Sequence, residues 1–96
     1  MKSEAVTLTD HASARLQQRG IPAPILGWLL AHGRKIHDHH GSKIVFFDHG
    51  ARERFRREQG DRAYRRFEQK LGAYAVVTTD GVVLTVGRRT KRLNRH

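Results

Sequence analysis

A dipeptide near the end of the chain, Asp80-Gly81, constrains the fold more than any other feature. It lies between the runs 74–79 and 82–88, which are rich in β-branched residues, and Asp-Gly in such a setting strongly favours a β-hairpin. A two-residue turn places Val76 opposite Thr85. A β-bulge beside the turn would shift this register by one residue and exchange the faces of one strand.

A second turn sequence, Gly41-Ser42, predicts a hairpin in the first half of the chain. It separates the runs 34–40 and 43–49, and Gly at the first central position suits a type II′ turn. Two-residue closure places Ile36 opposite Phe47. The second strand of this hairpin is apolar on both faces, so we expect it to lie inside a sheet.

Helix signals precede the first hairpin. Residues 11–19 contain helix formers throughout and follow Thr9 or Asp10, either of which suits an N-cap. Residues 22–32 begin with prolines that fit only a first helical turn, and they carry an apolar stripe that ends before Gly33. The sequence therefore predicts two N-terminal helices.

A third helical segment, 51–71, separates the two predicted hairpins. Gly60 interrupts it, and Asp61 is suited to cap a second helical piece. Because the helices are segregated from two hairpins, we expect an α+β fold with a four-stranded antiparallel sheet and helices packed on it. A chain of 96 residues predicts a single domain, 1–96.

The positive charge is concentrated in the second half of the chain. Nineteen Lys and Arg stand against nine Asp and Glu, a net charge of +10. Most of that excess lies after residue 50, and the segment 89–96 contains no acidic residue. This composition favours a polyanionic partner, with Arg89, Lys91, Arg92 and Arg95 as candidate nucleic-acid contacts. The alternative is a mobile terminus that only aids solubility.

The absence of cysteine removes disulfides, thiolate zinc sites and thiol nucleophiles. No run approaches the roughly 18 apolar residues of a membrane span, and the N-terminus has no apolar segment typical of a signal peptide. We therefore expect a cytoplasmic protein that does not contact membranes.

A histidine cluster around 37–40 is the most evident candidate for a metal site. Strand alternation directs His37 and His39 to one face and His40 to the other, so at most two ligands converge. We therefore predict no metal and no cofactor. His37 is instead a candidate contact to phosphate or base, and the alternative is a polar hairpin tip.

The first predicted helix carries His11, Arg15 and Arg19 at i, i+4 and i+8, which places an imidazole and two guanidinium groups along one stripe. Histidine transfers protons near neutral pH, and arginine stabilises charge developing on phosphorus. The stripe therefore suits phosphodiester cleavage. The alternative is a histidine stabilised locally by Asp10, with two solvated arginines.

The order and spacing of these motifs resemble a family of small bacterial proteins catalogued as a domain of unknown function. The resemblance rests on His11-Ala12-x2-Arg15-x3-Arg19-Gly20-Ile21 and on the terminal segment 80–88, Asp-Gly-Val-Val-Leu-Thr-Val-Gly-Arg. That family has been grouped with the ribonuclease fold of barnase, EndoU, colicin and RelE. It implies N-terminal helices on a four-stranded antiparallel sheet, and often an RNA-cleaving toxin.

Position by position, the resemblance implies a site made of His11, Arg15, Thr85 and Arg88. Related proteins tend to have an aromatic residue before the final arginine, where this chain has Gly87. The resemblance also admits an antitoxin or immunity protein as a partner.

Two functional hypotheses follow. The first is a metal-independent, toxin-like endoribonuclease in which His11 transfers protons, Arg15 and Arg88 bind the scissile phosphate and Thr85 orients them, with His37 as a second proton carrier. The second is a noncatalytic module that binds nucleic acid or a protein partner. In both, Arg19 and the terminal cations contact phosphates.

Overall fold

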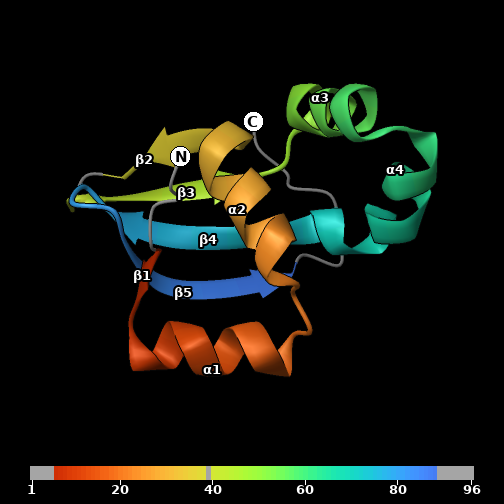
Figure 1. Cartoon of the computed structure of the whole chain (residues 1–96). Helices are drawn as coiled ribbons and strands as arrows, with labels where there is room; N and C mark the ends of the chain where they lie inside the picture. The colour runs from red at the N-terminus through yellow and green to blue at the C-terminus, as the bar shows by residue number, and fades with distance from the viewer. Residues whose placement is uncertain (1–5, 39, 89–96) are drawn as a thin grey trace.

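A five-stranded β-sheet flanked by helices forms the centre of the structure, a computed structural model that describes residues 6–38 and 40–88 (Figure 1). The predicted α+β class is confirmed. The elements in chain order are β1 (Thr7–Leu8), α1 (Asp10–Gln18), α2 (Ala23–His32), β2 (Arg34–His37), β3 (Ser42–Phe46), α3 (His49–Gln59), α4 (Asp61–Phe67), the 3-10 helix η1 (Glu68–Gly72), β4 (Ala73–Thr78) and β5 (Val82–Arg88). The strand order is β1-β5-β4-β3-β2.

Strand β1 makes the sheet mixed, so the prediction of four antiparallel strands is wrong in this detail. Thr7 pairs with Val82 in parallel orientation. Thr9 lies between β1 and α1 and anchors this junction to β5. Its backbone N–H donates to the Val83 carbonyl at 3.0 Å, and its Oγ1 donates to the Leu84 carbonyl at 3.0 Å. The same Oγ1 accepts the Ala12 N–H and caps α1. A two-residue strand leaves no periodic pattern in the sequence, because the pairing depends on the contact with β5.

The first hairpin has a different register from the predicted one. Ile36 lies opposite Ile44, and not opposite Phe47. The Asp38 N–H donates to the Ser42 carbonyl at 2.9 Å, and the Asp38 carboxylate accepts the Ser42 N–H at 3.1 Å. The loop is therefore longer than two residues. The Asp38 side chain accepts a hydrogen bond from the backbone of the loop, and this bond stabilises the longer loop in place of a tight turn. The prediction that β3 is an inner strand is confirmed.

The second hairpin has the predicted register beyond an irregularity near its turn. Val76 lies opposite Thr85 as expected, but Val77 lies opposite Val83 because a bulge shifts the register between them. As a result, Val83 and Val86 are both buried although they are three residues apart. The bulge thus turns both valines towards the helices, and it leaves Thr85 on the other face of the sheet.

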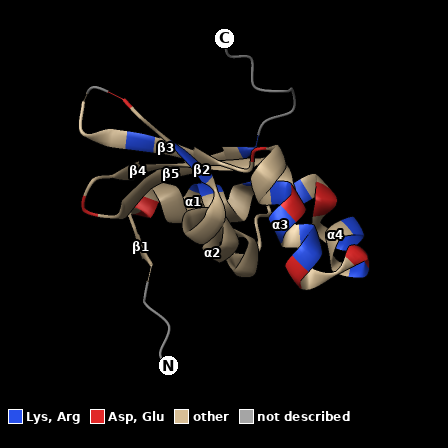
Figure 2. Cartoon of the chain, turned by 90° about the horizontal axis from the view of Figure 1, so that it is seen from above, with Lys and Arg blue, Asp and Glu red and all other residues tan. Residues whose placement is uncertain are grey.

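Helices α1 and α2 lie on the same face of the sheet, and α3 and α4 extend beyond its end (Figures 1 and 2). Alternate residues of β4, namely Ala73, Ala75 and Val77, join Ala12 of α1 and Leu29 of α2 in one buried cluster. The alternation follows from the two-residue period of a strand. Helix α1 runs beside β5, and α2 packs against β3 and β4.

The break predicted at Gly60 is confirmed by a φ of 95°, which favours glycine. Asp61 does not cap α4 as predicted; it is the first residue of that helix and accepts a 2.8 Å hydrogen bond from Arg56 Nε. The hydrogen bond, together with the positive charge of Arg56, lowers the pKa of Asp61. The same hydrogen bond and charge raise the pKa of Arg56.

Candidate nucleic-acid interface

Helix α1 carries the predicted proton-transfer residue on its solvent side. His11 is exposed, and Arg15, one turn further along, is half-buried. Arg15 Nε is buried, and the structure gives it no hydrogen-bond partner among the residues it describes. Arg19 is exposed at the end of the helix, where a cation is favourable for the helix dipole. The predicted stripe of α1 is therefore present, and one guanidinium nitrogen in it has an unmet hydrogen bond.

Thr85 and Arg88 lie on opposite faces of the sheet. Arg88 pairs with Ala73, whose side chain is buried under the helices, so Arg88 shares the face that α1 covers. Thr85 pairs with Val76 on the other face. The backbone register therefore places Arg88, but not Thr85, on the same side as α1.

The remaining predicted contacts are distant from α1 or outside the described residues. His37 ends β2, an edge strand, and β3 and β4 lie between it and β5. Its side chain is exposed. The four terminal cations Arg89, Lys91, Arg92 and Arg95 belong to segment 89–96, outside the described residues.

The ring of Tyr74 covers Gly87 on the face opposite α1. A Cβ atom at position 87 would lie 2.7 Å from Tyr74 Oη and 2.8 Å from two ring carbons, closer than non-bonded atoms approach. Tyr74 is the cross-strand partner of Gly87. An aromatic ring is therefore present beside position 87, but it comes from β4 and not from β5.

Sequence reasoning missed a hollow of about 410 Å³ that lies between the end of α2, the start of β2 and the first turns of α3. We call it the arginine hollow. Three arginines and one aspartate are among the residues that line it, and it is open to solvent. Its lining residues are His32, Arg34, Asp48, Gly50, Ala51, Arg54 and Arg57.

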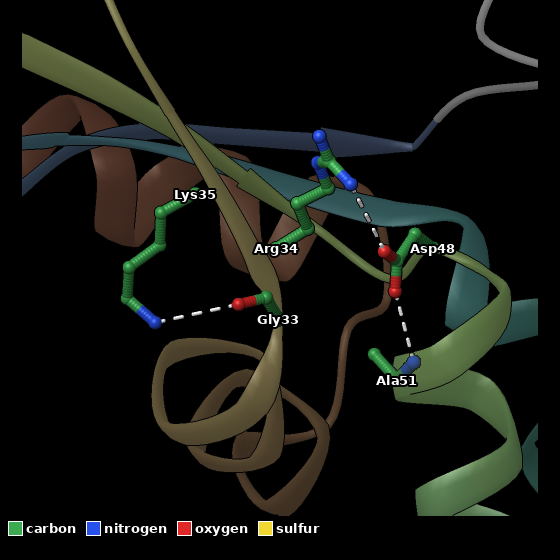
Figure 3. A network of polar contacts seen from close by, with 5 residues as sticks. All are labelled: Gly33, Arg34, Lys35, Asp48 and Ala51. Carbon is green, nitrogen blue, oxygen red and sulfur yellow. Dashed lines mark hydrogen bonds and ion pairs between the residues drawn. The ribbon is translucent and has the colours of Figure 1, made fainter.

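Asp48 organises one wall of the arginine hollow (Figure 3). Its Oδ1 accepts the Ala51 N–H at 2.9 Å and so caps α3, while its Oδ2 lies 3.8 Å from Arg34 Nη1. That separation is too long for a hydrogen bond. The Arg34 side chain is 61% exposed and forms no hydrogen bond within the described part of the chain. Its donors are therefore available to a ligand.

His32 and Arg54 form another part of the lining. Arg54 Nη1 lies 3.0 Å from His32 Nδ1. Because a guanidinium can only donate, a hydrogen bond between these atoms requires Nδ1 to be the acceptor. The centroid of the Trp28 ring lies 4.3 Å from that of the imidazole, so the two rings pack together. His32 is thus positioned by contacts with Trp28 and Arg54.

The arginines of α3 are divided between structural contacts and the arginine hollow. Arg52 donates to the Leu71 carbonyl at 3.0 Å, and Arg56 pairs with Asp61. Arg54 and Arg57 line the hollow, on the same stripe of the helix as the small residue Gly50. A small residue one turn before two arginines at helical spacing is the signal in the sequence that could have revealed this site.

The chain matches no family model, no curated protein and no solved structure. Across residues 6–38 and 40–88, no group of three His, Cys, Asp or Glu side chains is placed to hold a metal ion. No helix in this part of the chain has the length and apolar character needed to cross a membrane.

Proposed function

We propose that the protein binds RNA and that the arginine hollow is one of its phosphate sites. The observation that carries this proposal is that three arginines from β2 and α3 line one hollow, together with a single acidic residue, Asp48. Guanidinium groups bind phosphate oxygens in bidentate geometry, and hydrogen bonds between charged groups are about twice as strong as neutral ones. Such a cluster is unfavourable without an anion, because like charges repel.

Two further features support RNA as the source of the phosphate. The net charge of +10 favours a polyanion over a small anion, and cations are frequent on α3, the helix that supplies Arg54 and Arg57 to the hollow (Figure 2). The motifs on α1 and β5 resemble a family of unknown function that has been grouped with ribonuclease-like toxins, and this grouping favours RNA over DNA.

Salt-dependent binding tests this proposal. Affinity for a single-stranded RNA oligonucleotide should fall with salt, with a log–log slope of about −0.7 for each phosphate neutralised. The variant Arg54→Gln/Arg57→Gln should weaken binding and reduce the slope by about 1.4, since two contacts are lost. The control Arg62→Gln/Arg65→Gln removes the same charge from exposed positions of α4, outside the hollow, and should change the slope much less. A slope near zero for the parent protein would contradict RNA binding.

Endoribonuclease activity is a second candidate, supported by the exposed His11 and the unmet hydrogen bond of Arg15 Nε one turn away. In this reaction His11 accepts the proton of a 2′-hydroxyl, the 2′-oxygen attacks phosphorus, and the 5′-oxygen leaves with a proton from a second acid. Arg15 and Arg88 stabilise the charge that develops on the phosphate oxygens.

Cleavage of labelled RNA in the presence of a chelator tests the second candidate. His11→Ala should lower the cleavage rate by about 10²-fold to 10⁴-fold without loss of RNA affinity. His49→Ala, which removes another exposed histidine, is the control and should cleave normally. Full cleavage by His11→Ala would exclude the assigned role.

A further inference from the structure

We infer that the arginine hollow takes a terminal phosphate monoester of RNA in preference to an internal phosphodiester. This inference rests on the proposed function, because it specifies which phosphate of the RNA the hollow binds. It does not involve the residues of α1 and β5.

The charge of the arginine hollow matches a monoester better than a diester. Arg34, Arg54 and Arg57 supply three positive charges, and Asp48 supplies one negative charge. The three arginines and Asp48 together therefore give the lining an excess of two positive charges. A terminal phosphate carries about −1.5 to −2 near neutral pH, whereas each internal phosphodiester carries one negative charge.

The arrangement of donors also favours an end group. The residues that line the hollow come from three elements: His32 lies at the end of α2, Arg34 begins β2, and Arg54 and Arg57 belong to α3. A monoester presents three free oxygens to such a cluster, whereas an internal phosphodiester presents only two. Cations that follow the backbone of a continuous strand form an extended groove. Three arginines from two elements that line one hollow instead suit a site for a single group.

Asp48 limits the amount of negative charge that the arginine hollow accepts. Its carboxylate is held in place by the Ala51 N–H, which donates to Oδ1 at 2.9 Å. It therefore cannot turn away easily when an anion approaches. A second phosphate beside the first would be repelled by this fixed carboxylate, so a strand that ends in the hollow is favoured over one that continues through it.

Binding of end-modified oligonucleotides tests this inference. RNA of one sequence is prepared with a 5′-phosphate, with a 3′-phosphate, or with hydroxyl groups at both ends, and affinities are compared at fixed salt by fluorescence anisotropy. We expect one phosphorylated form to bind about tenfold more tightly than the hydroxyl form, as befits charge-assisted hydrogen bonds. The two phosphorylated arms show which end is bound.

Variants test whether the arginines of the hollow cause the preference for a phosphorylated end. Arg34→Gln and Arg54→Gln should each reduce the preference for the phosphorylated end to about threefold or less, and the double variant should abolish it. Arg62→Gln, which removes an exposed charge of α4 outside the hollow, should retain it. Circular dichroism of each variant verifies that the fold is intact.

The outcomes separate this inference from the proposed function. Equal binding of all three oligonucleotides, with affinity lost in Arg54→Gln, would overturn the terminal-phosphate assignment and leave RNA binding standing. A preference that survives in the double variant would place the terminal phosphate elsewhere and also overturn it. Tighter binding of a phosphoserine peptide than of phosphorylated RNA would assign the hollow to a protein partner. Failure to bind any oligonucleotide at low salt would contradict the proposed function itself.

Discussion

The contact between Tyr74 and Gly87 makes a quantitative prediction about the sheet. In Gly87→Ala, the new Cβ would lie 2.7 to 2.8 Å from three atoms of the Tyr74 ring. Because non-bonded carbons prefer about 3.5 to 4.0 Å, the ring must move by about 1 Å. Overpacking of this kind costs about 1–3 kcal/mol. Gly87 does not have a positive φ, so alanine fits the backbone there and contributes about 0.4–1 kcal/mol of opposing stabilisation through the unfolded state. We expect a net loss of about 1–2 kcal/mol in the free energy of unfolding.

A double-mutant cycle measured by urea unfolding isolates this contact. In a Tyr74→Ala background the ring is absent, so Gly87→Ala should be neutral or stabilising by about 0.5 kcal/mol. The coupling energy between the two positions should then be about 2 kcal/mol, with unchanged m-values. If Gly87→Ala is as stable as the parent while Tyr74 is present, the ring does not occupy the space above Gly87 and the reasoning is wrong.

Three further predictions concern other contacts. Gly33→Ala should lower the free energy of unfolding by about 3 kcal/mol in thermal or urea denaturation, because its Cβ would lie 2.6 Å from the Leu29 carbonyl oxygen, a backbone atom that cannot rotate away. Asp48→Ala should cost about 1 kcal/mol in the same assay through loss of the α3 cap, whereas Asp48→Asn should retain most of that stability because Asn also caps helices. Asp61 should titrate at a lower pH in the parent than in Arg56→Gln when followed by NMR, and the stabilisation from this pair should be lost as the pH falls through the Asp61 pKa.

Local signals predict the elements of this fold well, and they predict its loops poorly. The hairpin at Asp80-Gly81 has the expected register from Val76 to Ala73, although the turn is one residue longer than expected, since Val77 lies opposite Val83. The extra residue in the turn shifts the register by one residue at Val77, and the bulge shifts it back before Val76. No such compensation exists in the first hairpin, where the side chain of Asp38 reorganises the loop.

The sequence could predict the arrangement of candidate residues only where they lie within one helix. The helical period places His11 and Arg15 one turn apart, and both lie on α1 as expected. The arginine hollow requires His32 and Arg54, 22 residues apart, to meet in space. The arginines of α3 alone have the composition of a solvated helix, and only the packing of α3 against the end of α2 distinguishes those that line a site.

The pairing of β1 with β5 joins the first and the last strand of the described sheet. Thr9 and Leu84, which are 75 residues apart, share a hydrogen bond, and α1 packs along β5. During synthesis, helix α1 therefore lacks the strand along which it packs until β5 leaves the ribosome, whereas the pairing of β2 with β3 joins residues that are close in sequence. A fragment that stops before Val82 loses the support of α1 and the partner of β1 together with β5 itself. We therefore expect the nascent chain to remain incompletely folded, and exposed to proteases, until β5 has been made.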